Sequence, residues 1–287
     1  MPIGLITTFR AADPARTRNL ERVLAWYARM PDWELLVVEQ DATPMLDSSE
    51  WPGSVRHVYL PNPGPFNKGW GLNVGAQLSR REVLYFCDAD LLLPHDALAT
   101  ASSLCQRRVL AVNPYDHLRE LNRDETEAIL NGTTEPDFDP AHASRGRGDR
   151  EQLNFCGGAF LMRRDLHRRL GGFDERYVGW GAEDDAMSLK LGRFTSNVAQ
   201  LELRAAVHLW HPRPEAQTFG NPHYERNRAR LERLGEISDD QLVFLCDLQR
   251  QIMGNPDKYL RVPDNEVETG GRTDARPTSA ERSEPDG

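Results

Sequence analysis

Short apolar runs separated by helical patterns fill the first 113 residues. Four of these runs read as buried strands, over residues 3–8, 33–39, 55–60 and 83–87. After the first run, Asp13 suits a helix N-cap and a proline follows at the first helical position. Strands that alternate with helices are typical of βαβ units, so the pattern predicts an α/β fold with a mostly parallel, Rossmann-like central sheet flanked by helices.

The rest of the chain divides at changes in polarity. A helix near residues 94–105 and a strand at 109–113 complete the first half. Residues 114–150 then become polar, charged and rich in glycine and arginine, which predicts a mobile loop or lid. Order returns over 151–262, with helices expected toward its end. Residues 263–287 contain almost no apolar side chains, so we expect a disordered tail.

Charge and composition exclude several classes of function. The formal net charge of −9 argues against binding of the negatively charged nucleic-acid backbone. No stretch approaches the roughly 20 apolar residues of a membrane-spanning helix. The first residues lack a basic start followed by a long apolar run, so the expected location is the cytoplasm. The four cysteines form neither a CxxC pair nor a zinc pattern, which favours buried thiols.

Two carboxylates one residue apart follow the fourth apolar run. Asp88 and Asp90 can both approach one hard cation if the chain turns at the strand end. An Asp-x-Asp pair alone is common in loops and helix caps. Its position after a buried strand strengthens the metal hypothesis, because open α/β sheets bind ligands at the carboxyl ends of their strands.

A second acidic group follows an aromatic and a glycine. Glu183, Asp184 and Asp185 stand after Trp180 and Gly181. Three acids at a helix start are also explained by the helix dipole alone. The aromatic and glycine favour a cleft instead, where a carboxylate can serve as general base toward a hydroxyl group.

Two histidines end a late apolar run. His208 and His211 flank Leu209-Trp210, and a lone histidine in such a place is more often structural than a ligand. Together with the two aspartates, a neutral imidazole can complete a carboxylate set for manganese or a similar metal. His208 is the preferred ligand and His211 the second choice.

The order of these pieces resembles GT-A type glycosyltransferases of the glycosyltransferase family 2 class, and the later part looks like the galactosyltransferase C-terminal module. The resemblance covers about residues 1–215. Its most specific parts are Phe155-Cys156-Gly157-Gly158-Ala159-Phe160, Gly171-Gly172-Phe173-Asp174-Glu175 and Gly179-Trp180-Gly181-Ala182-Glu183-Asp184-Asp185.

The resemblance implies a division of labour. Residues 1–113 would form the nucleotide-sugar-binding half of a GT-A domain and 151–262 the acceptor-binding, catalytic half. It implies Mn²⁺ or Mg²⁺ as cofactor and a UDP-sugar as donor. The metal ligands would be Asp88, Asp90 and His208, the base Asp184, and Glu183 a contact of donor or acceptor. The donor-binding residues it implies are Thr7, Thr8, Phe9, Arg10, Glu39, Asp41, Asn67, Lys68, Asn73, Asp88, Ala89, Trp180 and Gly181.

The implied reaction is a single displacement with inversion, in which Asp184 takes the proton of the acceptor hydroxyl while the metal stabilises the leaving diphosphate. The acceptor would be a glycan, a lipid-linked saccharide, a small molecule or a protein. Gln40 stands where relatives more usually have aspartate, which leaves the contact of Glu39 and Asp41 with the base open. A donor carrying galactose or N-acetylgalactosamine follows from resemblance alone.

Three alternatives stay open. A sugar nucleotidyltransferase would need an early glycine-rich phosphate loop, and Ile6-Thr7-Thr8-Phe9 lacks one. A catalytically inactive module that binds nucleotide sugars or glycans is disfavoured by the presence of both the aspartate pair and Asp184. A retaining transferase is separated from an inverting one only by the resemblance.

Overall fold

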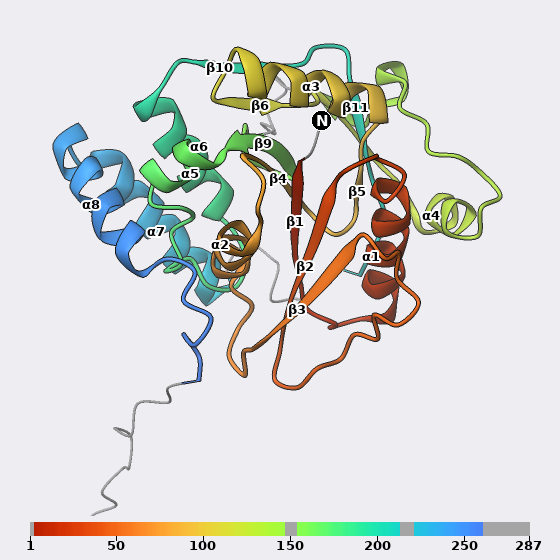
Figure 1. Cartoon of the computed structure of the whole chain (residues 1–287), viewed down its shortest axis with the longest axis horizontal. Coiled ribbons are helices and arrows are strands. Elements are labelled where there is room, and N and C mark those ends of the chain that lie inside the picture. Colours follow the sequence, from red (N-terminus) through yellow and green to blue (C-terminus); the bar gives the residue numbers. More distant parts are fainter. Residues whose placement is uncertain (1–2, 147–153, 213–220, 261–287) are drawn as a thin grey trace, which may run out of the picture.

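The computed structural model describes residues 3–146, 154–212 and 221–260 (Figure 1). A seven-stranded sheet and a smaller four-stranded sheet form its centre. The strands of the large sheet are β1 (Gly4–Phe9), β2 (Glu34–Asp41), β3 (Val55–Pro61), β4 (Val83–Cys87), β6 (Ala111–Asn113), β9 (Ala159–Arg163) and β10 (Val198–Gln200). Those of the small sheet are β5 (Leu91–Leu92), β7 (His117–Glu120), β8 (Arg145–Gly146) and β11 (Ala205–His208).

The helices surround these sheets. They are α1 (Pro14–Tyr27), α2 (Lys68–Leu78), α3 (His95–Arg107), α4 (Arg123–Leu130), α5 (Arg164–Arg169), α6 (Glu183–Phe194), α7 (Pro222–Glu236) and α8 (Asp239–Ile252), with a 3₁₀ turn η1 (Pro140–His142). Within the described residues, none of them is long and apolar enough to cross a lipid bilayer.

The large sheet has the strand order β10-β6-β9-β4-β1-β2-β3. Strands β3, β2, β1 and β4 run parallel, which confirms the predicted βαβ arrangement. Strand β9 lies antiparallel between β4 and β6, so the sheet is mixed beyond β4. Because β9 brings the second half of the chain into the middle of the sheet, the two predicted halves share one core.

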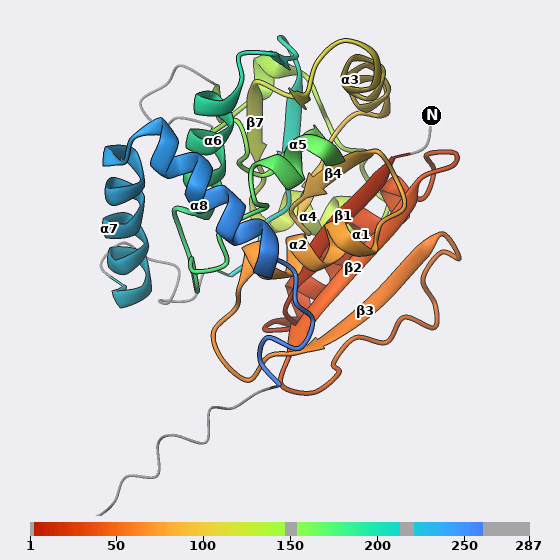
Figure 2. The same ribbon diagram turned by 60° about the vertical axis from the view of Figure 1, so that its left-hand side comes forward.

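Both faces of the central strands are buried, as their near-continuous apolar runs require. In β1, Leu5 faces the core cluster that contains α1 and α3, while Ile6 faces the cluster with α2, α5 and α6. Figure 1 shows α1 and α2 on opposite sides of the sheet. Helices α7 and α8 pack outside α6 and α5 around a third apolar cluster that includes Leu234 and Leu242 (Figure 2).

The polar segment predicted to be a mobile loop or lid contains regular elements in its described part, namely β7, α4, η1 and β8. Helix α4 has a complete capping box, in which Asn122 and Glu125 each bond the other's backbone N–H. Strand β7 pairs with β11, a long-range contact that its own sequence does not predict. The mobility of residues 114–150 stays a prediction, and residues 147–150 and 263–287 lie outside the described residues.

Candidate functional site

The carboxyl end of β4 and the end of β11 meet at one edge of the structure. The backbone N–H of Leu209 donates to the carbonyl of Asp90 at 2.8 Å. In the small sheet, β5 runs antiparallel to β11, with Leu91 opposite His208. This pairing brings the aspartate turn and the two histidines together although more than 110 residues separate them.

Asp90, His208 and His211 form one candidate metal group, the only such group among the described residues. One ligand atom of each lies within 4.8 Å of the other two. The Asp90 carboxylate is 3.5 Å from Nε2 of His208 and 3.2 Å from Nε2 of His211. Burial opposes ionisation of Asp90, but the two imidazoles keep its pKa below the usual value. A carboxylate and two imidazoles are a suitable donor set for a divalent transition metal.

His211 is the better fixed of the two histidines. Its Nδ1 lies 2.9 Å from the carbonyl of Pro212, which can only accept a hydrogen bond, so Nδ1 carries a proton and Nε2 is the ring atom that faces Asp90. Such a carbonyl partner is typical of metal-binding histidine. The sequence placed His211 second to His208, whereas the structure brings both to Asp90.

Asp88 lies outside this group. Its carboxylate pairs at 2.9 Å with Nζ of Lys68, the first residue of α2. The same Nζ lies 2.9 Å from Asp184 and 3.7 Å from Glu183. Lys68 therefore connects the aspartate turn of β4 with the start of α6, and its expected contact with the donor stays a prediction.

The three carboxylates around Lys68 carry more negative charge than one ammonium can neutralise. Burial, followed by the charges of Glu183 and Asp88, raises the pKa of Asp184 to about 8, although Lys68 opposes this. Burial also raises the pKa of Glu183. Oδ2 of Asp184 accepts from Lys68, while Oδ1 is buried and has no hydrogen-bond partner among the described residues. A carboxylate oxygen with a pKa near neutrality and no partner is suited to take a proton.

The start of α6 is built from unusual backbone. Gly179 and Gly181 have φ of 78° and 98°, and Ala182 has φ of 68° at the N-cap. A Cβ on Gly181 would lie 2.6 Å from the ring of Tyr224, so only glycine fits there. That ring stacks on Trp180 at 5.3 Å. The left-handed alanine is costly, and such backbone strain is concentrated at functional sites.

Two further side chains hold this turn. Asn227 of α7 donates to three carbonyls of the turn, including those of Trp180 and Gly181. Asn154 donates to Asp185, whose pKa is raised by burial. The sequence did not single out Tyr224, Asn227 or Asn154, because they lie far along the chain from the motif that they support.

The residues expected at the donor's base and ribose are largely buried in the fold. Thr7 and Phe9 are buried, Phe9 within the main apolar core. Thr8 donates to the carbonyl of Val38 and accepts from Gln40. Ala89 also packs against the main core. Their contact with a nucleotide stays a prediction.

Arg10 and Asp41 link β1 to its neighbours. The Arg10 guanidinium donates to the carbonyls of Gln40, Asn62 and Gly64 at 2.7–3.0 Å. Burial lowers the pKa of Arg10, partly offset by Asp41. Asp41 accepts from the N–H of Ala11, and burial raises its pKa. The donors of Arg10 are thus directed at protein backbone.

Glu39 is fully buried and already bonded. Its carboxylate accepts from the N–H groups of Met45 and Leu46 and faces Nε2 of His57 at 2.7 Å. Gln40, also fully buried, exchanges four hydrogen bonds with its surroundings and thereby joins β1, β2 and the segment before α2.

Asn67 and Asn73 tie α2 to the second half of the chain. Asn67 caps α2 and donates to the carbonyl of Glu175. Asn73 both donates to and accepts from the backbone of Phe173. Their amides join the two halves in this structure, and a role of either in binding a nucleotide stays a prediction.

Comparisons with known proteins identify a matching segment and a shared fold. A family model described as the N-terminal domain of galactosyltransferase matches residues 143–212, which include the acidic turn and both histidines. This match confirms the resemblance of the later part of the chain to galactosyltransferases. A search of curated proteins finds no match.

Structures of S. aureus TarS share the fold, and a Drosophila structure is more distantly similar. S. aureus TarS in complex with UDP-GlcNAc has a TM-score of 0.55 at 13% identity, covering 88% of this chain and 72% of that chain. A complex of TarS with UDP gives 0.53 at 14%, covering 84% and 68%. A variant of Drosophila β1,4-galactosyltransferase 7 with manganese, UDP-Gal and xylobiose gives 0.48 at 18%, covering 79% of both chains. The fold and the matched segment together support a GT-A type glycosyltransferase.

Proposed function

We propose that this chain is a metal-dependent, inverting glycosyltransferase that moves a hexose or N-acetylhexosamine from a UDP-sugar to a hydroxyl acceptor. The observation that carries the proposal is the pairing of two sites at one edge of the structure. One is the Asp90, His208 and His211 group, and the other is Oδ1 of Asp184, which has no hydrogen-bond partner in the described part of the chain. Lys68 and the aspartate turn connect them.

The metal is proposed to be held by Asp90, His208 and His211. When bound, a divalent ion supplies positive charge to the leaving diphosphate. Two imidazoles favour Mn²⁺ over Mg²⁺, because Mg²⁺ prefers oxygen ligands and keeps much of its water. UDP as the nucleotide is supported by the nucleotide sugar bound to TarS, which shares the fold.

The chain's own residues would manage the proton and the acceptor. The acceptor oxygen attacks the anomeric carbon and passes its proton to Oδ1 of Asp184. The bond between the anomeric carbon and the diphosphate oxygen breaks, and its electron pair leaves with UDP. Lys68 compensates the charge of Asp184 and Asp88 before the donor arrives. Trp180 and Tyr224 offer aromatic surface for a sugar acceptor beside this carboxylate.

The first test is release of UDP from a panel of UDP-sugars by the purified protein with Mn²⁺, with and without chelator. Slow hydrolysis of the donor needs no known acceptor. Metal-dependent release from one donor supports the proposal and identifies the sugar. Tight metal-dependent nucleotide binding without turnover would instead support a binding module. Formation of pyrophosphate from a sugar phosphate would support a nucleotidyltransferase.

A further inference from the structure

The turn that carries Asp90 leads into a very short strand. Strand β5 has only two residues, and it is paired on one side by β11. Since Leu91 lies opposite His208, the position of β5 sets the distance between Asp90 and the histidines. Two residues of sheet give little support of their own, so something else must hold this segment in place.

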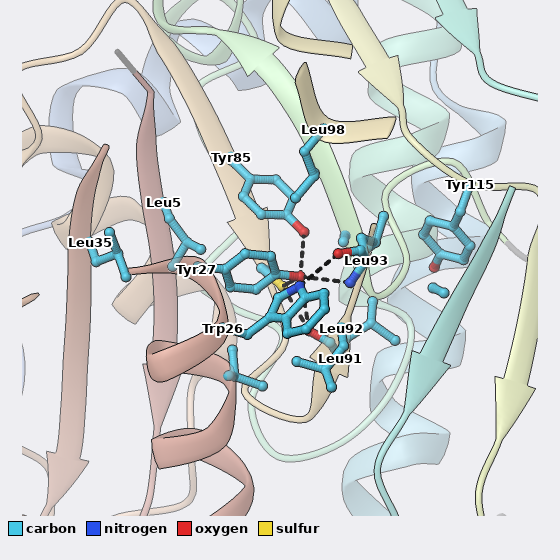
Figure 3. Packing of buried hydrophobic residues seen from close by; sticks show 14 of the residues in the cluster. Leu5, Trp26, Tyr27, Leu35, Tyr85, Leu91, Leu92, Leu93, Leu98 and Tyr115 are labelled. Carbon is cyan, nitrogen blue, oxygen red and sulfur yellow. Dashed lines mark hydrogen bonds between the residues drawn. The ribbon is translucent and has the colours of Figure 1, made fainter. Parts of the chain in front are cut away.

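Tyr27, the last residue of α1, provides that support. Its side chain is fully buried, and its hydroxyl donates to the carbonyl of Leu91 at 3.1 Å and accepts from the N–H of Leu93 at 3.1 Å. The hydroxyl of Tyr85 lies 3.1 Å from the same oxygen. A hydroxyl has one hydrogen, which Leu91 receives, so Tyr85 is the donor in that pair. Figure 3 shows these bonds converging on the Tyr27 oxygen.

A second side chain of α1 acts on the same segment. Nε1 of Trp26 donates to the carbonyl of Leu93 at 2.8 Å. Both backbone groups of Leu93 are thus bonded by neighbouring residues at the end of α1. Because this region is buried, water cannot replace a lost partner, and an unsatisfied group costs about 1–3 kcal/mol. Moving β5 away from α1 would break these hydrogen bonds, so they hold the strand in place.

We propose that Tyr27 is a positioning residue for the metal site. Its hydroxyl bonds the first residue of β5 and the residue that follows the strand, a clamp that holds Asp90 at the distance from His208 and His211 that a divalent cation requires. The inference rests on the proposed metal site, because Tyr27 itself does not reach the ligands and acts through the backbone of Leu91 and Leu93.

The test is direct binding of Mn²⁺ to the full chain without donor, by titration calorimetry or by the electron paramagnetic resonance of free Mn²⁺. Tyr27→Phe keeps the ring and removes the clamp, and its Kd should rise about tenfold or more, as for other residues that support metal ligands indirectly. Tyr85→Phe is the matched control. It removes one hydroxyl from the same network but leaves both bonds of Tyr27 to β5, so its Kd should stay close to wild type.

Each outcome decides a specific claim. An unchanged Kd in Tyr27→Phe overturns the inference. An equal rise in both variants also overturns it, because general loosening of the core would then explain the effect. If Tyr27→Phe does not fold, Trp26→Phe tests the same clamp, and a folded Trp26→Phe with wild-type affinity would count against it. A wild-type protein that does not bind Mn²⁺ would refute the proposed metal site instead.

Discussion

Buried polar side chains are hydrogen-bonded differently in two regions of the molecule. One region is the end of β2 beside β1, and the other is the start of α6. At the end of β2, Glu39 and Gln40 are completely buried, and each polar atom of their two side chains has a protein partner. At the start of α6, Glu183 and Asp184 share one lysine, and an oxygen of Asp184 has no partner among the described residues. The first arrangement stabilises the fold, whereas the second keeps charge available for chemistry.

This contrast explains why resemblance alone assigned both regions to the site. Short motifs identify residue types and order, but they do not reveal whether a carboxylate is already used by its neighbours. Glu39 and Asp184 are both acidic residues near the end of a strand or helix, and only their hydrogen bonds distinguish a structural from a catalytic role. Substitutions of the two residues should therefore affect different properties, stability for Glu39 and turnover for Asp184.

The largest effect is expected for Asp184→Asn. An amide cannot accept the acceptor proton, and a positioned base contributes about 10²- to 10⁴-fold, so kcat for transfer should fall by about 10³-fold. Donor binding should be unaffected, because the metal group is intact. Steady-state release of UDP and calorimetric binding of UDP with Mn²⁺ measure the two quantities.

Asp165→Asn is the matched control for this change, since Asp165 is an exposed carboxylate of α5 that pairs with Arg163 and accepts from the N–H of Leu166. It should turn over like the wild type. A fully active Asp184→Asn would remove Asp184 from the role of base.

The next effect separates the two aspartates of the β4 turn. Asp90→Asn should weaken Mn²⁺ binding by more than about 100-fold, since even residues that only support a ligand are worth 10- to 100-fold. Asp88→Asn should bind Mn²⁺ nearly as the wild type does, because Asp88 faces Lys68. Equal losses in both variants would restore the ligand set expected from sequence, in which Asp88 also binds the metal.

Glu39→Ala should act on stability. The change leaves the N–H groups of Met45 and Leu46 and the ring of His57 without their acceptor, so the free energy of unfolding should fall by about 2 kcal/mol. Urea denaturation measures this loss. The Kd for UDP should be unchanged in the folded protein, and a selective loss of UDP binding without a loss of stability would instead make Glu39 a nucleotide contact.

The smallest effect concerns pH. A base works in its deprotonated form, so turnover should increase as pH rises through about 8, the pKa of Asp184. Lys68 lowers that pKa, whereas Glu183 and Asp88 raise it. Lys68→Met should therefore move the rising limb to higher pH, and Lys68→Arg should keep it near the wild-type position. If both variants show the same pH profile, Lys68 does not influence the pKa of the base.

Much of the fold follows from local pattern. The parallel strands β1 to β4 are apolar runs with turn residues between them, and burial on both faces makes them easy to identify. Strand β9 is a short apolar run, but its antiparallel insertion beside β4 depends on long-range pairing. For the same reason β7 was missed, because its polar sequence forms a strand only through β11.

The site was predictable where one segment contains the chemistry. Asp90 and Asp184 stand in such segments, and the structure places both at the proposed centre. The joint presence of His208 and His211 depends on how β11 pairs with β5, which spacing does not specify. The positioning role of Tyr27 could not be predicted from the sequence, because a tyrosine at the end of an amphipathic helix is usually a core residue.

The most direct test of the central claim is the configuration of the first sugar released. Proton nuclear magnetic resonance can follow hydrolysis of an α-linked UDP-sugar by the wild-type protein with Mn²⁺, before the anomers equilibrate. The account predicts that the β-anomer appears first, that chelation stops the reaction, and that Asp184→Asn slows it by about 10³-fold. Initial release of the α-anomer, or release that persists without metal or without Asp184, would contradict it.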